Sequence, residues 1–268
     1  MSDITLSRSV EVTANGGELP RASLSASLAL VVGFWWAATG VTLAMQRSAF
    51  TSTASVITAT VFAVVGCLLI VNSRHETTVR GARFAFLGSA LVWWWCSTLF
   101  YAGVGIHIAD NISTGPRTFA LAFQAIEATV RPDLVGVLAL ILVAALVRST
   151  PNRTAFWTLL VFFATLQTAK LNVFMGVRNS GIDWLPEHLV GLSRFFGPPQ
   201  NSPLLPVTIV GLAVCFVVSA ARSHEAASAF RKHMLAMLSF LLGLALLEHV
   251  FLGVNLTLPL WDIFKPLR

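Results

Sequence analysis

Charged residues are scarce in this sequence. Asp, Glu, Lys and Arg together make up 11% of its 268 residues, whereas apolar residues make up 56%. A soluble domain is typically about 25% charged, so this chain has too little charge to cover a surface exposed to water. We therefore expect lipid to surround most of the protein, and we expect no soluble domain large enough to function away from the bilayer.

Cysteine and the common catalytic motifs are also lacking. The three cysteines, Cys67, Cys96 and Cys215, form no C-x-x-C pair, and each lies in an apolar stretch. This placement favours small packing residues over disulfide or metal chemistry. The sequence contains no phosphate-binding loop, no G-x-G-x-x-G, no H-E-x-x-H and no G-x-S-x-G. These absences leave the main nucleotide-binding, zinc-protease and serine-hydrolase classes without support.

The chain carries a formal net charge of +6, but it has no basic stripe interleaved with aromatic residues. Its Lys and Arg residues gather at the ends of apolar stretches, where they orient a membrane protein and contact anionic lipid headgroups. The sequence therefore predicts a lipid bilayer as partner and argues against nucleic acid.

Long apolar stretches are what the sequence has in abundance. A helix needs about 20 largely apolar residues to cross the hydrocarbon, and seven stretches come close to or meet this length. The predicted fold is all-α, a polytopic transmembrane helical bundle, with residues 1–22 as a polar N-terminal tail and 23–268 as a single transmembrane domain. The predicted spans are Ser23–Met45, Ser52–Val71, Arg83–Ile106, Asp133–Val147, Thr154–Phe174, Leu204–Ala221 and His233–Val254.

The fourth span and the N-terminal tail differ from the other segments. The fourth span is short, and we expect it to continue Thr118–Arg131, before Pro132, as an interfacial helix or a kinked extension. The N-terminal tail has neither the basic region nor the small-residue cleavage site of a secretory signal, so we expect it to be retained.

The distribution of Lys and Arg predicts the orientation. With seven spans, ten of these residues fall on the side of the N-terminus and seven on the other. Because positive charge prefers the cytoplasm, we expect a cytoplasmic N-terminus in a bacterial inner membrane. The ten are Arg8, Arg21, Arg74, Arg80, Arg83, Arg148, Arg153, Arg222, Arg231 and Lys232.

Polar residues at membrane depth are the candidates for function, because a charge at the bilayer centre costs about 2.5–3.5 kcal/mol. Lys170 and Asn172 lie in the fifth span, and Glu248 and His249 in the seventh. At 1.5 Å per residue, Lys170 and Glu248 both lie about 22–24 Å from the cytoplasmic ends of their spans. The loop that follows the fifth span contributes two further candidates, Glu187 and His188.

The similar depth of these residues predicts one polar site near the outer face. It would combine spans three, five and seven with the long loop, including Tyr101, His107 and Gly115–Arg117. A Lys170–Glu248 ion pair would offset the desolvation of both groups. The alternative is structural: Lys170 extends to the headgroups, and Glu248 and His249 anchor a helix end.

Five tryptophans lie near mid-span, whereas an interfacial aromatic belt would place them at span ends. One interpretation is helix packing, and the other is a flat aromatic surface for a planar or polyene ligand. These residues are Trp35, Trp36, Trp93, Trp94 and Trp95.

Several motifs, in order along nearly the whole chain, resemble the PuhE-type photosynthetic complex assembly proteins of phototrophic bacteria. The resemblance rests on A-K-L-N-V-F-M-G-V-R-N followed by L-P-E-H-L, and on F-W-W-A-A-T-G, G-P-R and L-E-H-V-F-L. These motifs are Ala169–Asn179, Leu185–Leu189, Phe34–Gly40, Gly115–Arg117 and Leu247–Leu252.

The chain also departs from this family's pattern. Cys96–Ser97 replaces an expected Gln-Glu, Pro132–Asp133 replaces a His-Glu, and Arg178 replaces a proline. The resemblance implies a role in assembling the reaction centre and light-harvesting complexes. It also implies possible contact with bacteriochlorophyll. It does not specify a mechanism.

Three hypotheses follow. In the favoured one, the protein is a non-catalytic assembly factor that holds a bacteriochlorophyll or a nascent reaction-centre or light-harvesting subunit. A neutral imidazole can ligate the pigment's magnesium, which makes His249 and His188 candidates. The proposed cofactor-binding residues are His249, Glu248, His188, Glu187, Lys170, Asn172, Trp35 and Trp36.

The alternative is an intramembrane metal-dependent enzyme acting on a pigment or lipid-like substrate. Its metal would be bound by the two Glu-His pairs at 187–188 and 248–249, an incomplete set for two metals. A retinal protein is disfavoured because the interior of the last span has no lysine. A transporter is disfavoured because corresponding halves contain no pair of broken helices.

Overall fold

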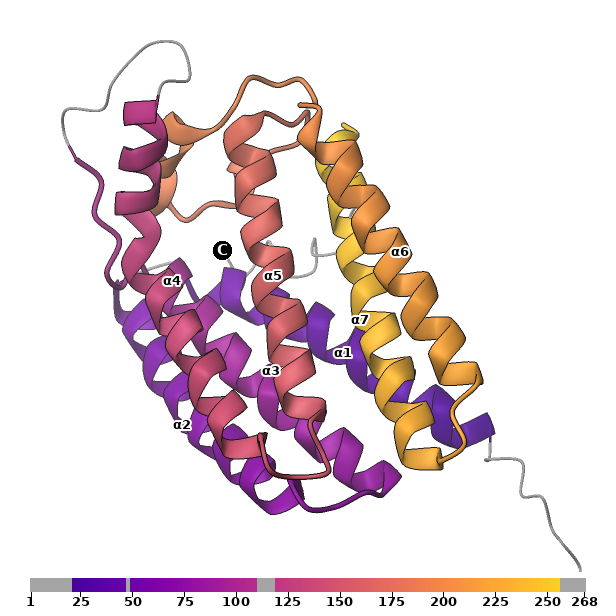
Figure 1. Ribbon diagram of the computed structural model, residues 1–268. Helices are drawn as coiled ribbons and strands as arrows, with labels where there is room; N and C mark the ends of the chain where they lie inside the picture. The colour runs from indigo at the N-terminus through magenta and orange to yellow at the C-terminus, as the bar shows by residue number, and fades with distance from the viewer. Residues whose placement is uncertain (1–20, 47–48, 110–118, 256–268) are drawn as a thin grey trace, which may run out of the picture.

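The computed structural model describes residues 21–46, 49–109 and 119–255, and the regular structure in these ranges is entirely helical. Seven helices there are long and apolar enough to cross a membrane, which confirms the predicted fold class (Figure 1). The N-terminal tail and Gly115–Arg117 lie outside the described residues. The long helices are α1 (Arg21–Met45), α2 (Ala49–Ser73), α3 (Val79–Tyr101), α4 (Phe119–Val147), α5 (Thr154–Met175), α6 (Leu204–His224) and α7 (Ala229–Gly253), and two 3-10 helices, η1 (Ile182–Trp184) and η2 (Glu187–Phe195), lie between α5 and α6.

The predicted bounds of the third span are wrong at both ends. Helix α3 begins at Val79 because the side chain of Thr78 caps it, accepting a hydrogen bond of 3.0 Å from the backbone N–H of Gly81. It ends at Tyr101, before Gly103 and Gly105, whose φ angles of 75° and 76° a helix cannot contain. Capping and backbone chemistry, rather than hydropathy, therefore set these ends.

Helix α4 confirms the predicted extension of the fourth span. It runs for 29 residues with Pro132 inside it. Proline has no N–H, so the carbonyl of Ala128, four residues earlier, loses its helical donor. The backbone N–H of His107 donates to this carbonyl over 3.3 Å. The loop after α3 thus supplies the hydrogen-bond donor that the proline cannot, so the Ala128 carbonyl is not left unpaired within the membrane.

Helix α3 is the centre of the bundle. More than half of its span is buried, a larger share than in any other predicted span of the described residues. It packs against α2, α4 and α5 on one side and against α1 and α7 on the other. Figure 1 shows α1 running diagonally behind α5 and α7, while α6 lies at the edge against α7.

Asn152 holds the connections together on the side of the membrane where α1 begins, which we call the amino side. Its buried side-chain amide donates to the carbonyls of Ser73 (2.9 Å) and Gly81 (3.1 Å), and its side-chain oxygen accepts from Thr154 N (3.1 Å). The α4–α5 connection is thereby tied to both ends of the α2–α3 connection.

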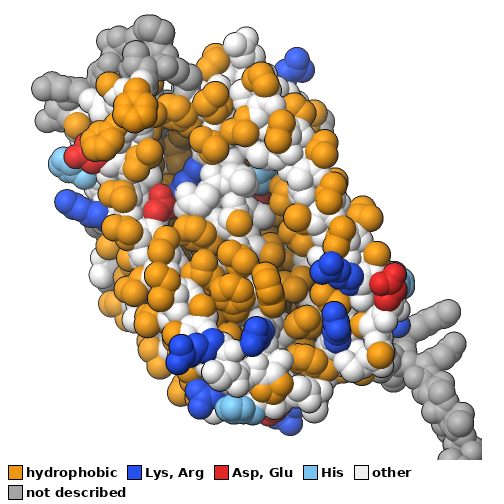
Figure 2. All heavy atoms as spheres, in the orientation of Figure 1, with side chains coloured by type: hydrophobic (Ala, Val, Ile, Leu, Met, Phe, Trp, Pro, Cys, Tyr) orange, Lys and Arg blue, Asp and Glu red, His pale blue; other side chains and the backbone are white. Residues whose placement is uncertain are grey.

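On the face shown in Figure 2, hydrophobic side chains cover much of the middle of the bundle. On α6, four exposed valines recur at helical spacing and point away from α7, as expected for a lipid-facing stripe. Figure 2 shows Lys and Arg side chains gathered toward the amino side, with fewer near the opposite side, which we call the far side. The four valines are Val207, Val210, Val214 and Val217.

We expect Gly88→Ala to destabilise the protein. A Cβ at position 88 would lie 2.6 Å from the backbone oxygen of Gly66, so α2 and α3 would have to move apart. Overpacking of this kind costs about 1–3 kcal/mol. Thermal unfolding in detergent measures the effect. Gly211→Ala is the control, because its Cβ would meet nothing within 4 Å, and equal effects at the two positions would contradict the close contact.

Candidate functional site

An open hollow lies between α1, α3, α5 and α7, toward the far side of the bundle. Its volume is about 190 Å³, and we call it the aromatic cavity because six aromatic side chains line it. Each of the four helices contributes at least one lining residue. The six are Phe34, Trp35, Trp93, Trp94, Tyr101 and Phe162.

Glu248 is the charged residue of this cavity. Its Oε1 accepts a hydrogen bond of 2.7 Å from Nε1–H of Trp35, which links α7 to α1. Its second oxygen, Oε2, has no partner among the described residues. Because Glu248 lines the cavity and is exposed, the cavity is open rather than sealed.

The hydroxyl groups of the cavity divide into two kinds. Thr39 and Thr165 donate to carbonyls of their own helices, at 2.9 and 2.8 Å. Thr42 does the same at 2.8 Å, and it also accepts from Nε1–H of Trp94 at 2.8 Å. Ser97 has no hydrogen-bond partner among the described residues. Among the serine, threonine and glutamate side chains of the cavity, Ser97 and Oε2 of Glu248 therefore have no hydrogen bond to another described residue, whereas the threonine oxygens can still accept one.

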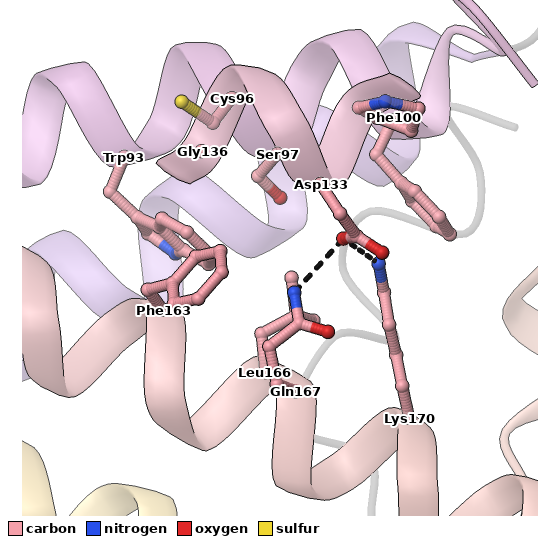
Figure 3. Close-up of a pocket in the computed structure, with 11 residues that line it drawn as sticks. Trp93, Cys96, Ser97, Phe100, Asp133, Gly136, Phe163, Leu166, Gln167 and Lys170 are labelled. Carbon is pink, nitrogen blue, oxygen red and sulfur yellow. Dashed lines mark hydrogen bonds and ion pairs between the residues drawn. The ribbon is translucent and has the colours of Figure 1, made fainter. Parts of the chain in front are cut away.

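A second, much smaller hollow holds an ion pair between α4 and α5 (Figure 3). Nζ of Lys170 lies 2.5 Å from Oδ1 of Asp133 and 4.6 Å from the centre of the Phe100 ring. Gln167 donates to the same carboxylate oxygen over 2.9 Å, and Thr129 donates to Oδ2 over 3.3 Å. The adjoining space is about 10 Å³, enough for one water at most.

The predicted Lys170–Glu248 pair is wrong. Lys170 points from α5 to α4, where Asp133 faces it, while Glu248 of α7 bonds to Trp35 of α1. The prediction missed Asp133 because it placed this residue at the start of a span. The helical extension instead puts Asp133 in the interior of α4, four residues after Thr129.

The structure resolves the predicted single polar site into two neighbouring hollows. They share Trp93, Ser97 and Leu166, which separate Glu248 from Lys170. Helices α3, α5 and α7 line the aromatic cavity together with Trp35 of α1, Asp133 of α4 lies in the smaller hollow, and the long loop after α5 lines neither.

His249 and Asn172 are buried away from both hollows. Nδ1 of His249 donates to Ala245 O (2.8 Å), and Nε2 lies 3.1 Å from Oγ1 of Thr168. A metal could reach Nε2 only by displacing Thr168. The side-chain amide of Asn172 donates to Thr168 O (2.9 Å) and to Thr208 Oγ1 (3.0 Å), which joins α5 to α6.

The loop residues lie outside the cavities as well. Glu187 and His188 are exposed on η2, and Nε2–H of His188 donates to the carbonyl of Tyr101 over 2.9 Å. His107 is exposed, and Trp36 lines neither hollow. Within residues 21–46, 49–109 and 119–255, no three His, Cys, Asp or Glu side chains come together to hold a metal. The metal-enzyme alternative therefore lacks a ligand set in this part of the chain.

The tryptophans serve both packing and cavity lining. Trp95 donates to Thr60 of α2 over 3.0 Å and lies outside the cavities, so its role is packing. Trp93 stacks on Phe162 with ring centroids 5.6 Å apart. Trp35 and Trp94 combine a hydrogen bond to another helix with a place in the cavity wall.

Comparison with known proteins adds a family to this geometry. The family described as "Protein of unknown function (DUF3623)" matches residues 22–265. The chain belongs to this family. A Rhodobacter capsulatus protein named "Uncharacterized 30.4 kDa protein in puhA 5'region" is 31% identical over 234 residues, which cover 85% of this chain and 84% of that protein. No solved structure matches the chain.

In this DUF3623 chain, two of the noted departures from the expected pattern fall in the hollows. Ser97 lines both of them, and Pro132 and Asp133 line the smaller one. A glutamate at position 97 would add a carboxylate between Glu248 and Asp133. The carboxylate that the resemblance predicts at position 97 would thus lie beside the polar groups of this chain, while at position 133 the chain keeps a carboxylate, Asp133, in place of the predicted glutamate.

A double-mutant cycle tests the ion pair. We expect Asp133→Asn and Lys170→Met each to lower the free energy of unfolding by about 1–3 kcal/mol, since each leaves a partly buried polar group without its partner. The double variant should recover part of this loss, giving a coupling energy that denaturation in detergent can measure. The control pairs Lys170→Met with Glu248→Gln, whose effects should add. Coupling of Lys170 to Glu248 instead of Asp133 would contradict the structure.

Proposed function

We propose that this protein is an integral membrane factor for the assembly of bacterial photosynthetic reaction-centre and light-harvesting complexes. The observation that carries the proposal is the open aromatic cavity at membrane depth, which supplies a place to hold a lipid-soluble component. The relative from the puhA 5′ region supports the link with photosynthesis, as does the resemblance to the PuhE-type proteins.

A holding role suits the chemistry of the cavity. Most of its wall is aromatic or aliphatic, and few of its polar groups are available for contact, as is typical of binding pockets. Trp35 and Glu248 form the polar edge of the site. Lys170, Asn172 and His249 stabilise the surrounding helices through contacts within the bundle. We propose binding, rather than bond making, as the function of this arrangement.

A whole bacteriochlorophyll does not fit inside the cavity. A cavity of about 150 Å³ takes up benzene, so the 190 Å³ here suits one ring or a short chain segment rather than a tetrapyrrole macrocycle. Such a pigment would enter with its hydrocarbon chain or one edge, and its magnesium would not reach His249. A side chain of a nascent subunit is small enough to enter the cavity.

The proposal includes a cytoplasmic N-terminus in the bacterial inner membrane, which the excess of Lys and Arg on the amino side supports. In a cysteine-free variant, Ala226→Cys lies in the α6–α7 connection and Val190→Cys in η2. We expect a membrane-impermeant maleimide added to spheroplasts to label position 190, and to label position 226 only after lysis. The reverse pattern would invert the orientation.

Deletion of the gene from a phototrophic host tests the assembly role. We expect the absorption of assembled complexes to fall several-fold, and the wild-type gene to restore it. Trp35→Phe removes the hydrogen bond to Glu248 in the cavity, so it should restore assembly poorly at equal protein level. Trp95→Phe removes a similar bond outside the cavity and is the matched control. Normal complexes in the deletion strain would overturn the proposal.

A further inference from the structure

We propose that the aromatic cavity binds a hydroxyl group on a lipid-soluble ligand, with Glu248 accepting its hydrogen bond and Ser97 donating to its oxygen. This inference deepens the proposed function by naming the chemistry of what is held. Its biological meaning rests on that function, but the binding itself can be tested independently. The class of ligand includes isoprenoid alcohols and phenols.

The available polar groups match a hydroxyl. Trp35 holds Oε1 of Glu248 and thereby fixes the carboxyl group against the cavity wall. Oε2 remains as an acceptor, and the Ser97 hydroxyl can donate or accept. An O–H group on a ligand can donate to Oε2 and accept from Ser97. It would thus satisfy polar groups that are costly to leave unpaired in an apolar setting.

The threonine hydroxyls of the cavity have no hydrogen left to donate to a ligand. Thr39, Thr42 and Thr165 each donate to a backbone carbonyl of their own helix, so they can still accept a hydrogen bond but cannot supply one. Among the serine, threonine and glutamate side chains, Ser97 therefore offers the donor, and Oε2 of Glu248 offers an acceptor that has no other partner among the described residues. The rest of the wall is aromatic or aliphatic and accepts an apolar body.

Size and depth favour a lipid-borne molecule. The volume of about 190 Å³ encloses one ring or a short chain segment. Phe162 and Leu241 lie at the inner end of the cavity. At 1.5 Å per residue they are about 12–18 Å from the amino ends of their helices, within the hydrocarbon. A ligand reaching this depth lies within the thickness of the hydrocarbon, so an apolar body is compatible with the site.

Two other ligand classes fit less well. A small hard cation such as Mg²⁺ or Ca²⁺ needs about six oxygen ligands, and the cavity offers one carboxylate and few available hydroxyls. A quaternary ammonium group would suit the aromatic wall, but it neither donates nor accepts a hydrogen bond and would leave Ser97 unmatched.

The test compares matched ligands on the full-length protein in detergent, with intrinsic tryptophan fluorescence as readout. One arm uses geranylgeraniol against its methyl ether, and the other uses thymol against its methyl ether. In each pair only the alcohol can donate. We expect at least one alcohol to bind wild-type protein about tenfold more tightly than its ether, the effect of one hydrogen bond to a charged group. The arm with the larger alcohol-to-ether affinity ratio shows whether the cavity prefers an isoprenoid alcohol or a phenol.

Three variants locate the contact. Glu248→Gln keeps an oxygen that can accept from Trp35, but it places an NH₂ donor where the ligand needs an acceptor. The alcohol should therefore bind this variant no more tightly than its methyl ether. Ser97→Ala should reduce the affinity for alcohol and ether alike, because both oxygens accept. Glu187→Gln, in an exposed residue of η2 outside the cavity, should keep the wild-type ratio.

If wild-type protein binds alcohol and methyl ether with nearly equal affinity in both arms, the inference is overturned. An unchanged ratio in Glu248→Gln would overturn it as well. Dodecyltrimethylammonium binding that is lost in Glu248→Gln, with no preference for alcohols in the wild type, would assign the cavity to an organic cation instead. A deletion strain with normal photosynthetic complexes but a tenfold ratio in vitro would refute the assembly role alone.

Discussion

In the hydrocarbon of a bilayer, a polar side chain must find its partner inside the protein, because no water is available. This constraint determines how the helices of this bundle meet. Asp133 of α4 faces Lys170 of α5, Asn172 of α5 reaches Thr208 of α6, and Trp95 of α3 reaches Thr60 of α2. Each pair selects one face of each helix, whereas apolar packing alone would allow several.

The aromatic cavity is one place where this matching is incomplete. Helix α1 crosses the bundle diagonally (Figure 1), and its far half lines the cavity together with α3, α5 and α7. Aromatic side chains fill much of that space, but Oε2 of Glu248 and the hydroxyl of Ser97 stay without partners. Neither residue is fully buried between helices, so a ligand in the cavity can reach both groups.

The two hollows are physically joined through helices α3 and α5. Trp93, Ser97 and Leu166 line both. Hydrogen-bonded pairs outside the hollows, such as Trp95–Thr60, join the surrounding helices to one another.

The sequence alone determined that the protein is a bundle of seven membrane helices, because hydropathy depends on residues that are neighbours in the chain. It also identified Lys170, Glu248 and Trp35 as unusual at their depth. It could not pair them. The prediction joined Lys170 to Glu248 by depth, but partners also depend on the rotation of each helix about its axis and on which helices adjoin. Only the tertiary structure decided that Asp133 forms the ion pair with Lys170 and that Trp35 donates a hydrogen bond to Glu248, because these partners are set by packing between distant segments.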